Sequence, residues 1–249
     1  MRRFVLVLAA LTAPVAAQDI SSGGITSSWT SSQLLLNADK SAWAAPQCID
    51  PARWAVSCGT PRPQATTPAE PIAEASSLSF ERSASVTRQS VARFLDQTRR
   101  ISPDGTEQIR QMLAQDVVGL IATAAKPYGL TTDNVADAMA IYAMEAWEVI
   151  SGEPLPPSRA RGQAVRAQMA RAIAAAPDFL RASDAEKQLV ADEMLYFAAM
   201  ANGGMQGARA QGPAAVKQWQ AAARQGARQA LGMDLAAMTL TDEGLQYRR

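Results

Sequence analysis

The stretch from Thr131 to Gly152, TTDNVADAMAIYAMEAWEVISG, decides how the rest of this chain is organised. Asn134 has the short acceptor side chain favoured at a helix N-cap, and Gly152 is the residue type that most easily adopts the left-handed backbone at a helix C-terminus. The residues between them predict a helix over 135–151 that is apolar on nearly every side. Such a helix is covered by neighbours on several sides, so we expect it at the centre of a bundle.

Apolar residues recur at helical spacing through most of the chain after residue 86. They predict further helices over residues 87–101, 103–126 with a break at Asp116, 158–176, 183–203 and 213–231. Ser183 and Glu186 form a capping box, and Gly203-Gly204 is expected to end that helix. No strand pattern is found, and the apolar tail 233–245 is expected to pack back on the bundle. The prediction is an all-α fold, a single bundle of six or seven helices packed around 135–151.

The first 17 residues have the three parts of a secretory signal peptide: a basic start, an apolar run from Phe4 to Leu11, and the small residues Val15-Ala16-Ala17. We therefore expect an exported protein, periplasmic or secreted, whose mature chain begins at Gln18. No later apolar run approaches the roughly 18 residues needed to cross a bilayer, so no transmembrane segment is expected after cleavage.

Residues 18–85 are rich in Ser, Thr, Pro, Ala and Gly and lack apolar periodicity, so they are predicted to form an irregular or loosely docked N-terminal arm. The stretch 60–79 is a Pro/Thr-rich linker, and residues 86–249 are the predicted helical domain. The arm carries Trp29, Trp43 and Trp54. These aromatic side chains are candidate docking residues, either for a groove on the protein's own domain, which we favour, or for an external partner.

The two cysteines of the chain, Cys48 and Cys58, suit a disulfide in an oxidising compartment. A metal site is not expected, because the chain has no His and two Cys do not complete a tetrahedral zinc shell. No motif for a cofactor is found either.

Charge is nearly balanced: the full chain has 24 basic and 23 acidic residues, and loss of Arg2 and Arg3 with the signal peptide leaves 22 basic ones. Nucleic acid is therefore not an expected partner. Lys217, Arg224 and Arg228 form a basic stripe on the last helix. This stripe is a candidate interaction face for an anionic partner, although a solvated face with a structural role is the favoured interpretation.

Catalysis without His would have to rely on carboxylates, and Asp137, Glu145 and Glu148 lie on the central helix. Asp137 and Glu148 are eleven residues apart, about 16 Å along a helix, which is too far for either glycosidase geometry. We expect structural roles: Asp137 in the first-turn cap, and Glu145 and Glu148 facing solvent or an arginine.

The blocks KPYGLTTDNVADAMAIYAMEAW and ARQGARQALGMDLAAMTLTDEG resemble an uncharacterised family of exported bacterial all-helical proteins, a domain of unknown function. The resemblance covers roughly residues 87–245 and implies the helical fold but no activity, ligand or site residue. We expect an exported non-enzymatic binding or scaffolding protein of the cell envelope, with an envelope protein or an anionic envelope polymer as partner. The alternative is a cell-envelope glycan hydrolase or lyase that uses a carboxylate as general acid or base.

Overall fold

The computed structural model describes residues 78–248, apart from 104, 175–178 and 180. In this part of the chain, seven α-helices form a bundle with a short β-hairpin at its C-terminal end. The helices are α4 (Ala84–Ile101), α5 (Thr106–Leu113), α6 (Val117–Ala125), α7 (Val135–Ser151), α8 (Arg159–Ala174), α10 (Asp184–Gln211) and α11 (Pro213–Leu231). The shorter elements are the 3-10 turns η1 (Lys126–Tyr128) and η2 (Leu235–Ala237) and the strands β1 (Met238–Thr241) and β2 (Gly244–Tyr247).

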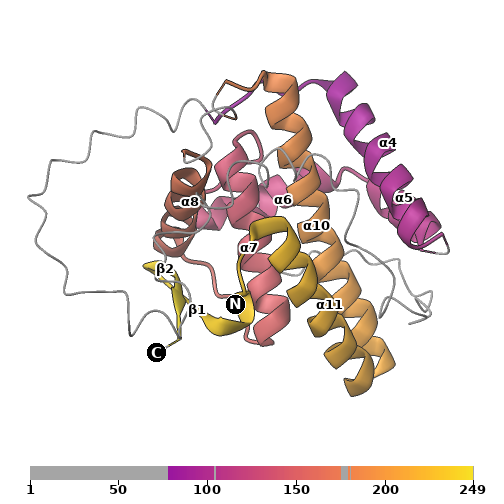
Figure 1. The fold of residues 1–249 in the computed structure, drawn as a ribbon, viewed down its shortest axis with the longest axis vertical. Coiled ribbons are helices and arrows are strands. Elements are labelled where there is room, and N and C mark those ends of the chain that lie inside the picture. The colour runs from indigo at the N-terminus through magenta and orange to yellow at the C-terminus, as the bar shows by residue number, and fades with distance from the viewer. Residues whose placement is uncertain (1–77, 104, 175–178, 180, 249) are drawn as a thin grey trace, which may run out of the picture.

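Helix α7 is the centre of the bundle, as predicted, with α8 on one side and α10 and then α4 on the other (Figure 1). Its N-cap is Asn134, whose side-chain oxygen accepts the backbone N–H groups of Ala136 and Asp137 at 2.9 and 3.3 Å. Its C-cap is Gly152, in the left-handed conformation at φ 72°. Both predicted ends are confirmed, and the helix between them is buried almost throughout.

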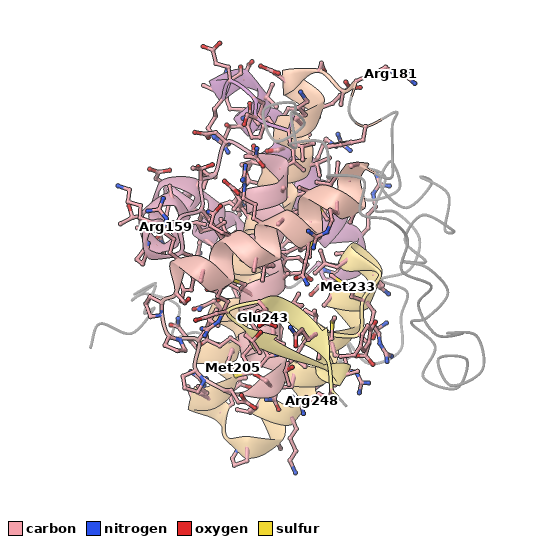
Figure 2. The ribbon with its side chains drawn as sticks, turned by 90° about the vertical axis from the view of Figure 1, so that its left-hand side faces the viewer. Arg159, Arg181, Met205, Met233, Glu243 and Arg248 are labelled. Carbon is pink, nitrogen blue, oxygen red and sulfur yellow. The ribbon has the colours of Figure 1, made fainter. Side chains whose placement is uncertain are left out.

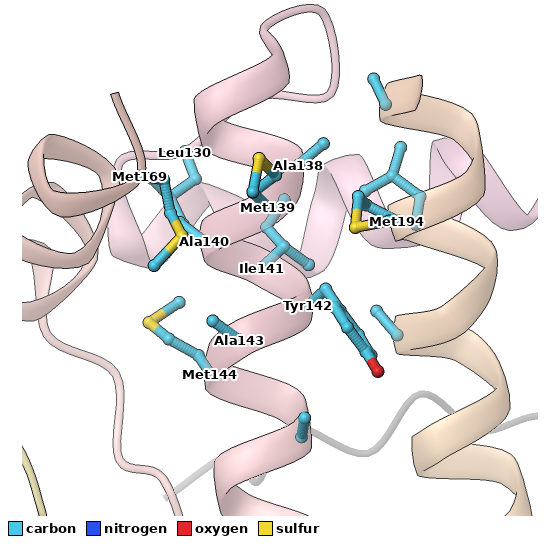
Figure 3. Close-up of a cluster of buried hydrophobic side chains, with 14 of the residues drawn as sticks. Leu130, Ala138, Met139, Ala140, Ile141, Tyr142, Ala143, Met144, Met169 and Met194 are labelled. Atoms are coloured by element: carbon cyan, nitrogen blue, oxygen red, sulfur yellow. The ribbon is translucent and has the colours of Figure 1, made fainter. Parts of the chain in front are cut away.

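Two faces of α7 pack against different neighbours (Figure 3). Ala140 lies toward Met169 of α8, while the ring of Tyr142 points toward α10. The Tyr142 and Phe197 rings have their centroids 5.5 Å apart. The small alanine side chains let α8 approach closely, and flexible methionines fill the remaining gaps.

Trp147 lies near the C-terminal end of α7 and connects it to the C-terminal tail. Its indole is 4 % exposed, and its N–H donates to the carbonyl oxygen of Met238 at 3.0 Å. A buried indole N–H needs such a partner, so this contact ties the C-terminal tail to the central helix.

The expected stop at Gly203-Gly204 is wrong, because α10 continues through both glycines to Gln211. A glycine inside a helix costs only about 1 kcal/mol relative to alanine, which packing can outweigh. Here the gain is room for Trp219 of α11: a Cβ on Gly204 would lie 2.0 Å from its indole ring. The Trp219 N–H also donates to the carbonyl of Ala201 at 3.0 Å, which fixes α11 against the second half of α10.

The C-terminal tail does pack on the bundle, but it forms a hairpin that sequence reasoning missed. Strands β1 and β2 are antiparallel, with Leu240 opposite Leu245. Figure 2 shows the hairpin, which carries Glu243, beside the helix of Arg159. Gln168 of α8 holds it by donating to the carbonyl of Leu245 and accepting that residue's N–H, both at 2.9 Å. Strands of four residues are too short for alternation to be recognised in the sequence.

Residues ahead of position 86, the predicted start of the helical domain, also pack against the bundle. The carbonyl of Leu78 accepts the N–H of Val135 at 3.0 Å, and the N–H of Phe80 donates to the carbonyl of Asp133 at 3.1 Å. Leu78 and Phe80 are 2 and 7 % exposed. The last residues of the predicted arm therefore belong to the core beside the start of α7.

Candidate functional site

Arg82 lies just ahead of α4, and its guanidinium group is held at three points. Nη1 lies 2.5 Å from Asp192 Oδ1 of α10, and Nε lies 3.0 Å from Asp133 Oδ1. Nη2 donates to the carbonyl of Thr132 at 2.7 Å. The group also lies over the Phe80 ring, 5.4 Å from its centroid. Arg82 is therefore fixed in one orientation.

Asp192, the buried partner of Arg82, is 0 % exposed and has further donors. Ser90 Oγ donates to its Oδ2 at 2.9 Å, and Gln188 Nε2 donates at 3.4 Å. The Tyr196 hydroxyl lies 3.2 Å from Ser90 Oγ, and burial raises the Tyr196 pKa to about 12. Burial opposes the charge of Arg82, but hydrogen bonds and charges from Asp192 and Asp133 outweigh it and raise the Arg82 pKa. The cluster is a satisfied, charged network.

A groove of about 350 Å³ opens beside this network, between α4 and α6, with Tyr196 of α10 also in its wall. We call it the Arg82 groove. Its lining consists of Arg82, Thr87, Val91, Leu113, Gln115, Asp116, Val117, Val118, Gly119, Ala122, Thr132, Asp133 and Tyr196. The walls are largely apolar and the rim is acidic.

The charges of the Arg82 groove favour a cationic occupant over an anionic one. Asp116 and Asp133 are exposed at its rim, whereas Arg82 already pairs with Asp133 and Asp192. Asp116 also caps α6, as predicted, by accepting the N–H of Gly119 at 2.9 Å. An incoming anion would meet that carboxylate rather than free helix N–H groups.

Glu145 of α7 is the second polar feature in the interior. Its side chain is buried, so the expectation that it faces solvent or an arginine is wrong. Asn202 of α10 donates to its Oε2 at 3.1 Å, and Gln206 donates in turn to Asn202 Oδ1 at 2.6 Å. Burial raises the pKa of Glu145 to about 7; Asn202 opposes the shift and the charge of Glu148 adds to it. Burial thus favours the protonated carboxyl over the ionised one.

The cavity beside Glu145 has a volume of about 20 Å³ and mostly apolar walls, including Ile121, Met144 and Leu155. This is room for about one water molecule. Tyr128 also lines it and donates its hydroxyl to the carbonyl of Leu155 at 3.0 Å. A sugar ring does not fit beside Glu145 in a cavity of this volume.

The other two carboxylates of α7 have structural roles. Asp137 lies in the first turn of α7, as expected, but its side chain bonds to Thr131 ahead of the N-cap: its Oδ2 accepts the N–H and hydroxyl of Thr131 at 3.0 and 2.8 Å. Its Oδ1 forms an ion pair with Arg166 of α8 at 2.6 Å. Burial raises the Asp137 pKa against these favourable contacts. Glu148 accepts the backbone N–H of Leu155, and burial raises its pKa as well.

The predicted basic stripe lies on the exposed face of α11. Lys217, Arg224 and Arg228 are all exposed. Arg224 and Arg228 both pair with Asp234, just after the helix, and the Arg224 contact is 2.7 Å long. Hydrogen bonds from Arg224 first, and then from Arg228, lower the pKa of Asp234 to about 2. Two of the three cations are thus already paired.

The remaining predicted site residues, Cys48, Cys58, Trp29, Trp43 and Trp54, lie outside the residues that the structure describes. Among those it does describe, no group of three His, Cys, Asp or Glu side chains could hold a metal ion. No helix in the same part of the chain is long and apolar enough to cross a membrane.

Comparison with known proteins places the chain in a family. The model of a family of unknown function, DUF6683, matches residues 2–248. The chain belongs to DUF6683. The match spans the arm as well as the helical domain, and so exceeds the resemblance seen over residues 87–245. Neither the curated proteins nor the solved structures contain a match.

The Arg82 network of this DUF6683 chain was not predicted, because its members lie far apart in the sequence. Arg82 and Asp192 are 110 residues apart. One signal was available on α10: Gln188, Asp192 and Tyr196 recur every four residues, which places three polar side chains in one row of the predicted helix. A polar row in a core must have partners, although the row does not tell which residues supply them.

Proposed function

We propose that the protein is an exported, non-enzymatic binding or scaffolding protein of the bacterial cell envelope, and that it binds its partner in the Arg82 groove. Export is supported by the signal-peptide pattern of residues 1–17. The observation that carries the binding role is the groove itself, whose volume of about 350 Å³ lies within the range of ligand pockets. Its polar end is held rigid by the Arg82–Asp192 pair, and a rigid site loses little conformational entropy on binding.

The groove favours an envelope protein over an anionic envelope polymer as the partner. In the groove an acidic polymer would meet the exposed carboxylate of Asp116, whereas the one guanidinium there, that of Arg82, is shared between Asp133 and Asp192. A protein segment can instead offer an apolar side chain to Val91, Val118 and Ala122 beside a cation for the rim carboxylates. The proposed ligand is therefore an exposed peptide segment with an apolar and a basic residue.

A photocrosslinking amino acid, p-benzoylphenylalanine, placed at position 118 tests this proposal in intact cells. Val118 lines the groove, whereas Leu120 on the same helix is 41 % exposed and lies outside it, so position 120 is the matched control. The proposal predicts a discrete crosslinked envelope protein from position 118 and none from position 120. Equal crosslinking from both positions, or none from 118, would contradict it.

The alternative function, a cell-envelope glycan hydrolase or lyase, is favoured by one observation. The pKa of Glu145, raised by burial to about 7, is suited to a general acid or base. The cavity of about 20 Å³ would have to open before a glycan could reach this carboxyl. Release of soluble fragments from purified cell-wall glycan, and its loss in Glu145→Gln, would support this alternative over the binding role.

A further inference from the structure

We infer that the Arg82 groove is covered by the protein's own arm when no partner is bound, with Trp54 against the apolar wall and Arg53 at the acidic rim. This inference rests on the proposed function, because it takes the groove to be a binding site. It adds a regulatory role for the arm: a partner would have to displace an internal ligand.

The arm joins the helical domain at one end of the groove. Phe80 donates its N–H to the carbonyl of Asp133, and Asp133 and Arg82 both line the groove. The chain preceding Leu78 therefore starts beside the site that it is proposed to cover. No other described segment leads from the groove into a length of chain outside the described residues.

The length of the arm permits this contact. Trp54 precedes Leu78 by 24 residues, and an extended chain spans about 3.3–3.6 Å per residue, so the linker reaches up to about 80 Å. A tether of this length gives an effective concentration on the order of millimolar. Even a weak contact would then keep the groove occupied.

The chemistry of the groove selects Trp54 from the three arm tryptophans. Trp54 directly follows Arg53, whereas Trp29 stands between Ser28 and Thr30, and Trp43 stands between two alanines. An indole suits the apolar surface of Val91, Val118 and Ala122, and the adjacent guanidinium suits the exposed carboxylate of Asp116. The segment also belongs to the part of the chain that the family model matches.

Photocrosslinking within the purified full-length chain tests the inference. With p-benzoylphenylalanine at position 118, we expect an intramolecular crosslink to the peptide that contains Arg53 and Trp54, identified by mass spectrometry. Position 120 is the control and should give none.

Trp54→Ala should abolish the crosslink. Arg53→Gln and Asp116→Asn should each lower its yield by roughly two- to fivefold, the factor for a partly exposed ion pair. Asparagine at 116 still caps α6, and unchanged melting curves would show that each variant is folded.

The possible outcomes separate this inference from the proposed function. Crosslinks to another part of the arm, to a second copy of the chain or to nothing would overturn the inference, whereas a discrete partner captured from position 118 in cells would still support the proposed function. An intramolecular crosslink to Trp54 without any captured partner in cells would support the inference and contradict the proposed function.

Discussion

Two buried carboxyl groups on neighbouring helices, Asp192 of α10 and Glu145 of α7, are accommodated in opposite ways. Asp192 is 0 % exposed and is met by Arg82, Ser90 and Gln188. Glu145 is 6 % exposed and is met by the neutral amide of Asn202. A buried carboxylate can stay ionised when a cation and several hydrogen-bond donors surround it. Without the cation, the protonated form has the lower free energy.

The comparison also separates the two sites by function. The Asp192 network fixes Arg82 at the edge of an open groove, where we propose that a partner binds. Glu145 lines a small cavity with room for about one water molecule, and burial in the bundle raises its pKa. Under the proposed function, the raised pKa of Glu145 therefore does not mark the binding site.

The largest expected loss of stability comes from removing the carboxylate of Asp192, which pairs with Arg82. Asp192→Ala leaves the half-buried Arg82 without its main partner, and breaking such a buried pair typically costs about 3–5 kcal/mol. Urea unfolding followed by circular dichroism measures this loss. The double variant Arg82→Met/Asp192→Ala removes both charges and should lose much less than the sum of the single variants. Additive losses would show that Asp192 acts through packing and not through the pair.

Glu145→Gln should stabilise the folded protein above neutral pH, whereas Asp192→Ala should destabilise it. In the folded chain burial raises the Glu145 pKa from 4.5 to about 7, so between these values the folded protein keeps a proton that the unfolded chain releases. The stabilising contribution is fully present below about pH 4.5 and is lost as pH rises to 7, by on the order of 3 kcal/mol. The variant should thus be more stable than the parent at about pH 8 and nearly equal to it at about pH 4.

Chemical unfolding at both pH values checks this expectation. Glu153→Gln, on the exposed loop after α7, is the matched control and should follow the parent curve. If the difference in stability between the parent and Glu145→Gln were the same at both pH values, the charge of Glu145 would be as well compensated as that of Asp192, and the comparison would fail.

The smallest expected effect concerns the one amide that meets Glu145. Asn202→Ala removes a neutral hydrogen bond, which is worth about 0.5–1.5 kcal/mol. Because this bond favours the ionised carboxyl, its loss should also make the decline in stability with pH larger than in the parent. A variant with an unchanged pH dependence would indicate that Asn202 does not bear on the charge of Glu145. Gln206→Ala, one step further from the carboxyl, should alter the decline less.

The fold was largely predictable because its signals are local. Asn134 and Gly152 mark both ends of α7, Ser183 and Glu186 form the predicted capping box of α10, and Gly232 ends α11. Each of these residues acts on backbone groups within a few positions, so sequence spacing is enough to identify it. The predicted helix end at Gly203-Gly204 was wrong because Gly204 makes room for the indole of Trp219. That side chain lies on another helix, so the spacing of residues around the glycines does not reveal it.

The candidate site was not predictable because it depends on contacts between distant segments. Arg82 belongs to a segment that composition assigned to the arm, and its partner Asp192 lies on α10. Burial of Glu145 likewise results from the packing of α10 and α6 on α7, which the helical pattern of α7 alone does not reveal. Charged residues on a helix are exposed in most proteins, so a prediction based on residue type assigns both carboxylates to the surface.

The most direct test of the central claim compares partner capture by the parent, Glu145→Gln and Asp116→Asn proteins. Each carries the photocrosslinker at position 118. The claim is that the partner binds at the Arg82 groove and not at Glu145. In intact cells the yield of crosslinked partner should be the same in the parent and in Glu145→Gln, and lower in Asp116→Asn, which removes a rim charge but keeps the cap of α6. Loss of the crosslink in Glu145→Gln together with an unchanged yield in Asp116→Asn would contradict the account.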